Sequence, residues 1–487
     1  MKSIFYTLIL YTFLFSSATL YGQEHAKEEK NHHTPKRKQA PDPHFSFKEL
    51  SPTIHCFEDS LEEKTLADAL RKGFFSAKMR NFLMFTDNQK GLEDFYANGF
   101  GMGLHYKSKN WHGLHMGVGG FFKFNLLSNH LEDSRYELDL FDIEDPKNHH
   151  DLDRLEELYL AYNTKHFAAR IGRFSIQTPY INPQDGRMRP AIQEGLHLQL
   201  NPIKKLQFEG AWIWAVSPRS TVDFSSVGNS LGIYSEGIRT DGLEANYFEH
   251  QKTKGIFLSD ILLNFQKIKF HLHNQYVENI FNTSLFSAEY IDLDSTTFSP
   301  LFGAQYHYQK RLNNGGNPNS ELAYYESQKQ AQAFSFRLGV ANYKHWFTLN
   351  YTRITKDGRF LLPREWGREP FFTFMPRERN EGQGDIHAIS TQYHSFWLEH
   401  KLSLTLGYGY YDLADVSNYK LNKYQLPSYY QFNVDLRYKF EGYFEGLEIQ
   451  CLVVRKESAK PQKNKEYVFN KNNLTNYNLV INYHFGK

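Results

Sequence analysis

Cysteine is nearly absent from this sequence, and long apolar runs are confined to its start. Only Cys56 and Cys451 occur among the 487 residues, so a disulfide-rich scaffold is excluded and a Cys56–Cys451 bridge is the single pairing open to an exported chain. After residues 4–20 no stretch of about 18 apolar residues follows, so no transmembrane helix is expected. Cys451 shares the parity of its apolar neighbours and is interpreted as a small lipid-facing hydrophobe.

Neither sign of charge is in excess. The chain has 56 Lys and Arg against 54 Asp and Glu, a net charge of +2, and it has no basic helix or zinc-finger spacing, which excludes nucleic-acid binding. Its 22 histidines form no recognisable catalytic or metal-ligand spacing, and His32-His33 reads as part of a solvated tail. No catalytic residues, cofactor or metal are therefore expected, and a barrel-embedded hydrolase stays only as an alternative.

The first residues indicate export. Met1-Lys2 give a positive start, and the apolar run 4–20 is followed by small residues. This pattern predicts a secretory signal peptide over residues 1–22.

The segment that follows, residues 23–72, is predicted to lie in the periplasm. Its first part, 23–44, is rich in Lys, Glu, His and Pro and cannot bury enough apolar surface to order itself. Further on, the spacing of Ser60 and Glu63 matches a capping box and predicts a short helix. The remaining residues, 73–487, have a different pattern.

Aromatic residues are abundant in a chain that is polar on average. There are 41 Phe and 32 Tyr, yet the mean hydropathy is -0.60. An outer-membrane β-barrel reconciles the two, because its strands alternate lipid-facing apolar and lumen-facing polar residues and its long loops are hydrophilic. A soluble β-sandwich is the alternative with the same alternation, but it would leave two apolar faces exposed.

From residue 74 onward the apolar residues follow a period of two. Within 402–410 every even position is Leu or Tyr, whereas the odd positions are Ser, Thr or Gly. Such runs have roughly the nine to eleven residues that a tilted transmembrane strand needs. Short connections alternate with long ones, as periplasmic turns alternate with outer loops. We predict an all-β, antiparallel transmembrane β-barrel of about eighteen strands, which begin near residues 74, 98, 112, 155, 167, 194, 205, 256, 268, 282, 298, 332, 345, 387, 401, 428, 446 and 475.

The last strand indicates how the chain reaches its membrane. Every second residue from Tyr477 to Phe485 is aromatic or aliphatic, which resembles the recognition signal of the outer-membrane assembly machinery. This machinery and the lipid and lipopolysaccharide of the bacterial outer membrane are the expected partners.

The most specific motif is RIGRFSIQTPYINPQDGRMRPAIQEGLHLQL, residues 170–200. It resembles the hallmark stretch of the OprD-type outer-membrane porin family, in which a strand ending in Gly-Arg runs into a loop with Thr-Pro, Asp-x-Arg-Met-x-Pro and Glu-Gly. The matching residues are Gly172, Arg173, Thr178, Pro179, Asp185, Arg187, Met188, Pro190, Glu194 and Gly195. Ser217-Pro218-Arg219 also fits, and 363–385 looks like the Bacteroidetes-type subgroup of that family. The likeness extends over roughly residues 70–485.

The resemblance implies a channel narrowed by one of its own loops. It implies an eighteen-stranded barrel, monomeric or weakly associated, whose third outer loop, 176–193, folds inward. It also implies uptake of small anionic solutes that carry carboxylates, such as amino acids.

The charged and proline residues of this loop have two interpretations. Guanidinium groups recognise carboxylates, so the cluster fits either solute binding or anchoring of the loop to the wall. We expect Arg187 to pin the loop together with Asp185, and Arg189 to face the pore. Pro179 and Pro190 would stiffen the loop into a fixed constriction.

Strand parity predicts the charge of the pore. We assign the mainly apolar parity to lipid, because a lipid-facing Arg or Lys costs about 2–4 kcal/mol at the bilayer midplane. The basic residues of the other parity are Lys78, Arg80, Lys107, Lys123, Arg170, Lys269, Arg337, Lys401, Arg437 and Lys439. The acidic residues of that parity are Glu157, Glu209, Asp435 and Glu448. The basic excess predicts a pore that prefers anions.

Parity and the loop motif together define the candidate site. The predicted pore-lining residues are Arg80, Lys123, Arg170, Arg173, Arg187, Arg189, Lys269, Arg337 and Arg437. Two further loops have alternative interpretations. The Arg- and Glu-rich region 353–385 fits a self-paired scaffold or a solute filter, and the acidic region 132–157 fits a solvated loop or a calcium site. For the whole chain, an adhesin or receptor barrel is the alternative to an open channel.

Overall fold

A computed structural model describes residues 62–129, 140–148, 152–184, 186–292, 296–326 and 330–486. They belong to one compact unit, which spans Ala40–Lys487. Within these ranges, no helix is long and apolar enough to cross a membrane.

A short helix, α2 (Leu66–Arg71), precedes the first strand. The Thr65 hydroxyl accepts a hydrogen bond from the Asp68 backbone amide at 3.1 Å, which satisfies one of the N–H groups left free at a helix start. The sequence predicted a helix in this region with a cap at Ser60. The helix is present, but its cap is Thr65, and Ser60 lies outside the described residues.

The strands form one continuous sheet. Its first seven strands are β1 (Phe74–Asp87), β2 (Phe95–Lys107), β3 (Leu114–Ser128), β4 (Arg154–Asn163), β5 (Phe167–Phe174), β6 (Ile192–Ile203) and β7 (Leu206–Ser217). A two-residue strand, β8 (Ser225–Ser226), lies beside the end of β7. The remaining strands are β9 (Ile256–Phe265), β10 (Ile268–Val277), β11 (Phe281–Tyr290), β12 (Ser299–Arg311), β13 (Gln330–Ala341), β14 (His345–Ile354), β15 (Ile386–Trp397), β16 (Leu402–Asp412), β17 (Tyr429–Lys439), β18 (Leu447–Ser458) and β19 (Leu474–Phe485).

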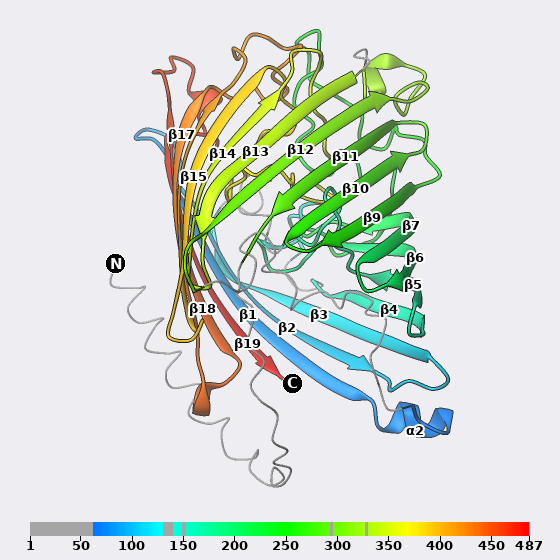
Figure 1. The fold of residues 1–487 in the computed structure, drawn as a ribbon. Helices are drawn as coiled ribbons and strands as arrows, with labels where there is room; N and C mark the ends of the chain where they lie inside the picture. Colours follow the sequence, from blue (N-terminus) through cyan, green and yellow to red (C-terminus); the bar gives the residue numbers. More distant parts are fainter. Residues whose placement is uncertain are drawn as a thin grey trace. The chain divides into compact units, whose positions relative to one another are not determined.

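The sheet closes into a barrel. β1 pairs antiparallel with both β2 and β19, and Ala77 lies opposite Phe485. Because β8 adds only two residues beside β7, the wall consists of eighteen antiparallel strands, which Figure 1 shows strongly tilted. Each wall strand begins within a few residues of its predicted position, so the predicted barrel is confirmed.

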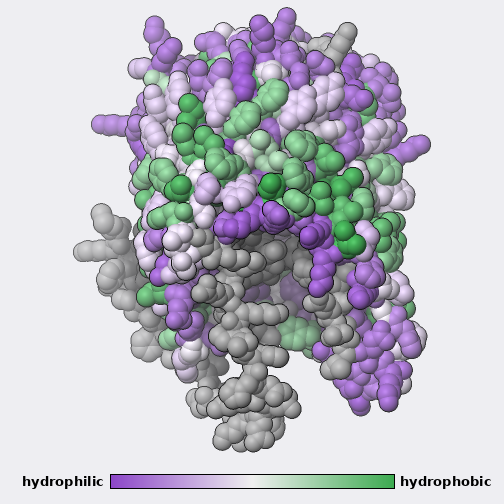
Figure 2. Space-filling view, viewed as in Figure 1, coloured by the Kyte–Doolittle hydropathy of each residue, from purple (hydrophilic) through white to green (hydrophobic). Residues whose placement is uncertain are grey.

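The two faces of the wall follow the predicted alternation. On β13, Phe336 and Leu338 are exposed outward, whereas Ser335 and Arg337, which alternate with them, are buried. Cys451 of β18 is likewise exposed, and its partner in the considered disulfide, Cys56, lies outside the described residues. In Figure 2 an apolar band crosses the visible surface, with hydrophilic side chains gathered at the upper end of the barrel. Such a band is what lipid-facing strands require.

Short and long connections alternate along the chain. At one end, which we call the short-turn end, turns of a few residues join β4 to β5, β6 to β7 and β9 to β10. At the other, the long-loop end, the connections include residues 175–191, 218–255 and 355–385. The connection of β10 to β11 is an exception, because it is short although it lies at the long-loop end. The predicted alternation is confirmed, and the orientation of the ends in the membrane stays a prediction.

The largest apolar core lies inside the barrel and is built mainly by loops. Ile181 of loop 175–191 and Trp366 of loop 355–385 belong to one buried cluster, which also includes Ile213 of β7. Loops that pack on one another and on the inner wall have a fixed position, and they determine the space left for a solute.

Candidate functional site

The inner wall has a covered zone and an open zone. On β10, Gln275 and His273 are at most 3% exposed, whereas Lys269, nearer the short turn, is exposed. On β17, Asn433 is buried and Lys439 is exposed. On both strands the inward side chains change from buried to exposed toward the short turns. We call the exposed inward side chains next to the short turns the open half. On these two strands, loops therefore cover the inner wall toward the long-loop end.

The third outer loop, residues 175–191 between β5 and β6, crosses the interior. Its Tyr180 hydroxyl lies 2.7 Å from Nδ1 of His307 on β12. At its other end Met188 packs on Gly99 of β2, where an added Cβ would lie 2.9 Å from the Met188 sulfur. β2 and β12 lie diametrically opposite in the order of the wall strands. A loop that contacts both spans the lumen.

Buried arginines of the wall hold the backbone of this loop. Arg80 of β1 donates from Nη1 to the Arg187 carbonyl at 2.7 Å, and Arg154 of β4 donates from Nη2 to the Pro190 carbonyl at 2.7 Å. Both arginines are 3% exposed. A carbonyl oxygen carries no net charge, so its bond positions Arg80 without neutralising it, whereas Arg154 also pairs with the Glu156 carboxylate at 2.8 Å.

Arg189 differs from its predicted role, whereas the role predicted for Arg187 stays a prediction. Arg189, expected to face the pore, is buried, pairs with Glu156 of β4 and holds its guanidinium carbon 3.8 Å from the centre of the Phe121 ring. Arg187, expected to pin the loop, is half-buried, and its guanidinium donates to the Gly186 carbonyl. The assignment of Arg189 to the pore was wrong, because an irregular loop has no periodicity to reveal which of two nearby arginines turns toward the wall.

Pro179 of the loop lies in a locally bonded turn. The Thr178 hydroxyl accepts a hydrogen bond from the Ile181 backbone amide at 3.1 Å, which closes a turn around Pro179. Pro179 and Pro190 are both half-buried. Asp185, the expected partner of Arg187, lies outside the described residues.

The β14–β15 loop, residues 355–385, also folds into the barrel, which the sequence did not predict. Lys456 of β18 donates to the Arg377 carbonyl at 3.2 Å. Phe372 lies under Arg337 of β13, whose guanidinium carbon is 4.2 Å from the ring centre. This loop therefore contacts the wall on β13 and β18.

Glycines on the inner face make room for the side chains of this loop. A Cβ added at Gly407 of β16 would lie 2.5 Å from the Met375 sulfur, and one added at Gly303 of β12 would lie 2.7 Å from the Phe372 ring. Real Cβ atoms do not approach so closely. Inward glycines in strands of regular alternation were the available sequence signal for a second inward loop.

The charges of the β14–β15 loop are partly paired within it. Arg364 Nε lies 3.6 Å from Glu381 Oε2. Burial, and then the neighbouring Glu369 carboxylate, hold the pKa of Glu378 well above its usual range. These contacts agree with the scaffold interpretation, and the filter interpretation stays a prediction.

Two other predicted pore residues lie on the inner face at different levels. Arg170 of β5 is buried, with its guanidinium carbon 4.3 Å from the centre of the Phe174 ring. Lys269 of β10 lies in the open half. The former is fixed by packing, whereas the latter is accessible from the short-turn end.

Two predicted pore cations lie beside inward carboxylates. Arg437 Nη2 is 3.0 Å from Asp435 Oδ2, and Arg337 Nη1 is 3.7 Å from Glu289 Oε2. Glu289 was missing from the predicted inward acids. Its presence reduces the basic excess that parity predicted.

Arg173 lies on the other face of the wall. On β5, Arg170 and Phe174 are buried, whereas Ile171, on the parity of Arg173, is half exposed. Arg173 Nε lies 2.9 Å from Glu194 Oε2, and the Trp214 indole donates to the same carboxylate at 3.0 Å. The prediction that Arg173 lines the pore was wrong, because it followed the loop motif rather than strand parity.

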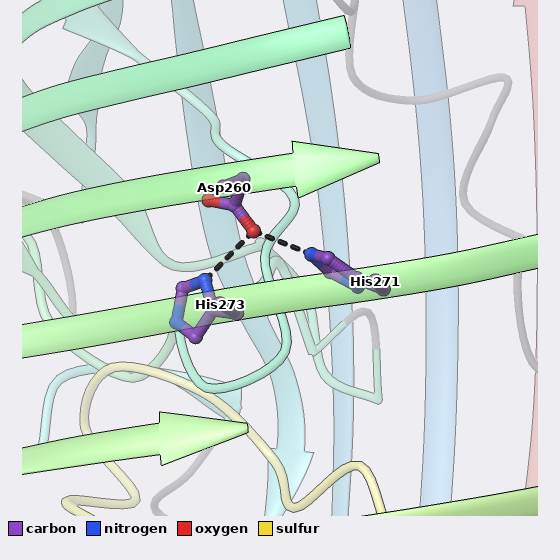
Figure 3. A group of neighbouring side chains, drawn as sticks. All are labelled: Asp260, His271 and His273. Carbon is purple, nitrogen blue, oxygen red and sulfur yellow. Dashed lines mark hydrogen bonds and ion pairs between the residues drawn. The ribbon is translucent and has the colours of Figure 1, made fainter. Parts of the chain in front are cut away.

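Inward side chains of two adjacent strands form one further cluster. His271 Nε2 and His273 Nδ1 of β10 lie 2.5 and 2.8 Å from the same oxygen of Asp260 on β9, as Figure 3 shows. In the described part of the chain, only this group brings three His, Cys or carboxylate ligand atoms within 4.8 Å of one another. Both histidines have the inward parity of Lys269, but the sequence assigned them no role. It missed Asp260, because β9 is largely apolar on both parities.

The described part of the acidic region is tied to its surroundings. Lys123 of β3, which is buried, donates to the Phe141 carbonyl at 2.7 Å. The Ile143 amide donates to the Ser220 carbonyl at 2.9 Å. Residues 140–148 are thus docked on the wall and on the loop after β7.

One carboxyl of this segment, that of Glu144, has a raised pKa. Burial, and then Asp142, Asp223 and Glu249, raise the pKa of Glu144 to about 7. Several acids of the region 132–157 lie outside the described residues, and the calcium interpretation stays a prediction.

Comparisons with known proteins agree with this architecture. A family model described as outer membrane porin, OprD family, matches residues 144–418. No curated protein matches the chain by sequence. Among solved structures, Acinetobacter baumannii OccAB4 is 17% identical, with a TM-score of 0.68, over 85% of this chain and 98% of its own. Pseudomonas aeruginosa OccD3 (OpdP) is 13% identical, with a TM-score of 0.67, over 92% and 99%. At such identities the structures support the fold.

Proposed function

Because the chain belongs to the OprD family of outer membrane porins, we propose that it gives small solutes passive, anion-preferring passage across the outer membrane. The proposed solutes carry carboxylates, as amino acids do. They pass between the inner wall and the two inward loops, residues 175–191 and 355–385, which set the narrowest level of the pore.

A group of buried cations on neighbouring strands carries the proposal. We call it the cationic arc, and its members are Lys456 of β18, Arg80 of β1, Lys123 of β3 and Arg170 of β5. In the sheet these four strands are neighbours but one: β19, β2 and β4 each lie between two of them.

Each member of the cationic arc donates a hydrogen bond to a backbone carbonyl, and Arg170 does so to Ser175 at 3.2 Å. A backbone carbonyl supplies no countercharge to these cations. A low-dielectric wall focuses the field of these charges into the lumen, and rows of Arg and Lys are how pores favour anions.

The opposite part of the wall offsets this field only in part. Asp260 and Glu289 add inward carboxylates, and Glu289 faces Arg337. We therefore rest the proposed selectivity on the cationic arc and not on Arg337 or Arg437.

The test is the reversal potential of the channel in a planar bilayer under a salt gradient. We expect anion preference for the unchanged protein and a lower anion-to-cation permeability ratio for Lys456→Gln, which removes a charge but keeps a hydrogen-bond donor. The matched control is Arg455→Gln, because Arg455 is exposed on the outward face of the same strand. Cation preference would contradict the proposed selectivity, and the lack of any steady conductance would favour the adhesin or receptor alternative.

A further inference from the structure

We propose that Asp260, His271 and His273 form a binding site for a divalent transition-metal ion, such as Zn²⁺, on the wall of the pore. Imidazole nitrogens suit zinc, copper and nickel, and a carboxylate oxygen completes common zinc ligand sets. The inference goes beyond the proposed function, because ion binding does not depend on which solutes pass.

The backbone places the three side chains together. His271 and His273 are two residues apart on β10, so they point to the same face of the strand. Asp260 of β9 lies directly opposite His273 in the register of the two strands. Sites on regular strands are held more rigidly than sites on loops, so the ligand set is largely preorganised.

The distances are close to those of a metal site. Zinc bonds of about 2.0–2.2 Å to N and O put the ligand atoms of a tetrahedral site roughly 3.3 Å apart. Here the nitrogens lie 2.5 and 2.8 Å from the Asp260 oxygen, and all three ligand atoms lie within 4.8 Å of one another. A metal ion would require each imidazole to withdraw by less than about 1 Å from the carboxylate, by the same zinc bond lengths.

One further observation indicates that a cation belongs here. On its other side Asp260 lies directly opposite Glu209 of β7. Like charges directly opposite in a sheet are destabilising, and a bound cation would offset that repulsion.

The cluster lies at the boundary of the covered zone. The Tyr180 ring of the third outer loop covers His273, with the ring centres 5.3 Å apart, while the His271 side chain is 25% exposed and borders the open half. Three protein ligands leave a fourth position of a tetrahedral ion for water or a solute. That position would face the lumen, where a carboxylate could occupy it.

Protonated histidines are the competing explanation, because two imidazolium groups would also balance Asp260. Metal titration of the full-length protein distinguishes the two. Detergent-solubilised protein without a polyhistidine tag is first treated with a chelator. It is then titrated with Co²⁺, whose visible absorption reports its ligands, and with Zn²⁺ in competition.

We expect the unchanged protein to bind one equivalent of the metal ion. The variants Asp260→Asn, His271→Gln and His273→Gln should each lose this binding or bind the ion at least tenfold more weakly. His394→Gln is the matched control, because His394 is a buried histidine of β15 beside Thr405 and is not part of the cluster. It should keep that equivalent. Equal binding by all four variants would overturn the site, as would an equal loss in the control.

A measurement on the unchanged protein covers variants that fail to fold. With one equivalent of Cu²⁺, electron paramagnetic resonance should show two coordinated imidazole nitrogens. More than two, as in a histidine-rich tail, or none would overturn the assignment to this cluster.

Discussion

The hydroxyl of Tyr180 lies 2.7 Å from Nδ1 of His307, and this buried hydrogen bond joins the third outer loop to β12. The loop starts at β5 and contacts β2 through Met188. It is therefore fixed at both sides of the lumen, which is the geometry of a static constriction.

Removing this hydrogen bond should loosen the constriction. Tyr180→Phe is expected to cost about 1 kcal/mol, the usual net contribution of a hydrogen bond, and to give larger or noisier single-channel currents. Tyr306→Phe is the control, because this tyrosine is on the outward face of β12 and its hydroxyl bonds Gln332 at 2.9 Å. If Tyr180→Phe and a deletion of 180–189 both conduct like the unchanged protein, the loop does not narrow the pore.

Filling the space at Gly407 should displace the β14–β15 loop. Gly407→Val would force its side chain against Met375, and overpacking of this kind costs about 1–3 kcal/mol. We expect a lower midpoint of urea unfolding and faster proteolysis within 355–385. Adding Met375→Ala should recover much of the loss, whereas Gly210→Val, where the nearest atom is 3.8 Å away, should change little. Additive effects of the Gly407 and Met375 substitutions would argue against the contact.

The buried pair of Arg189 and Glu156 should matter more for stability than an exposed pair. Arg189→Ala leaves Glu156 buried with Arg154 as its remaining ionic partner, and breaking a buried pair costs about 3–5 kcal/mol. Arg455→Ala breaks the exposed pair with Glu457 and should cost about 1 kcal/mol or less. Equilibrium unfolding of both variants measures the difference, and equal losses would refute it.

Docking of residues 140–148 should weaken as the pH rises. Burial raises the pKa of Glu144 from 4.5 to about 7, so the docked segment keeps a proton that the undocked segment releases. Stability of docking therefore falls between about pH 4.5 and pH 7 and is constant above that range. Hydrogen exchange of the Ile143 amide, which donates to Ser220, measures it. At about pH 8, Glu144→Gln should protect this amide better than the unchanged protein, with no such difference at about pH 5. Equal protection at the higher pH would contradict the prediction.

The sequence by itself determined the barrel and the faces of its strands. Side chains alternate between the faces of a strand, and one face meets lipid, so the parity of Leu and Tyr in residues 402–410 was enough to locate β16. The same rule placed Arg80 and Arg170 inside. Arg173 has the outward parity on β5, but we assigned it to the pore from the loop motif, and that assignment was wrong.

Only the tertiary structure decided how the interior is filled. The contact of Met375 with Gly407 and the burial of Arg189 against Glu156 join residues from irregular loops to distant strands. No local periodicity encodes such contacts, because they depend on how a whole loop folds back. The meeting of Asp260 with His271 and His273 likewise required the register of β9 and β10, since parity gives the face of each side chain but not its neighbour across the sheet.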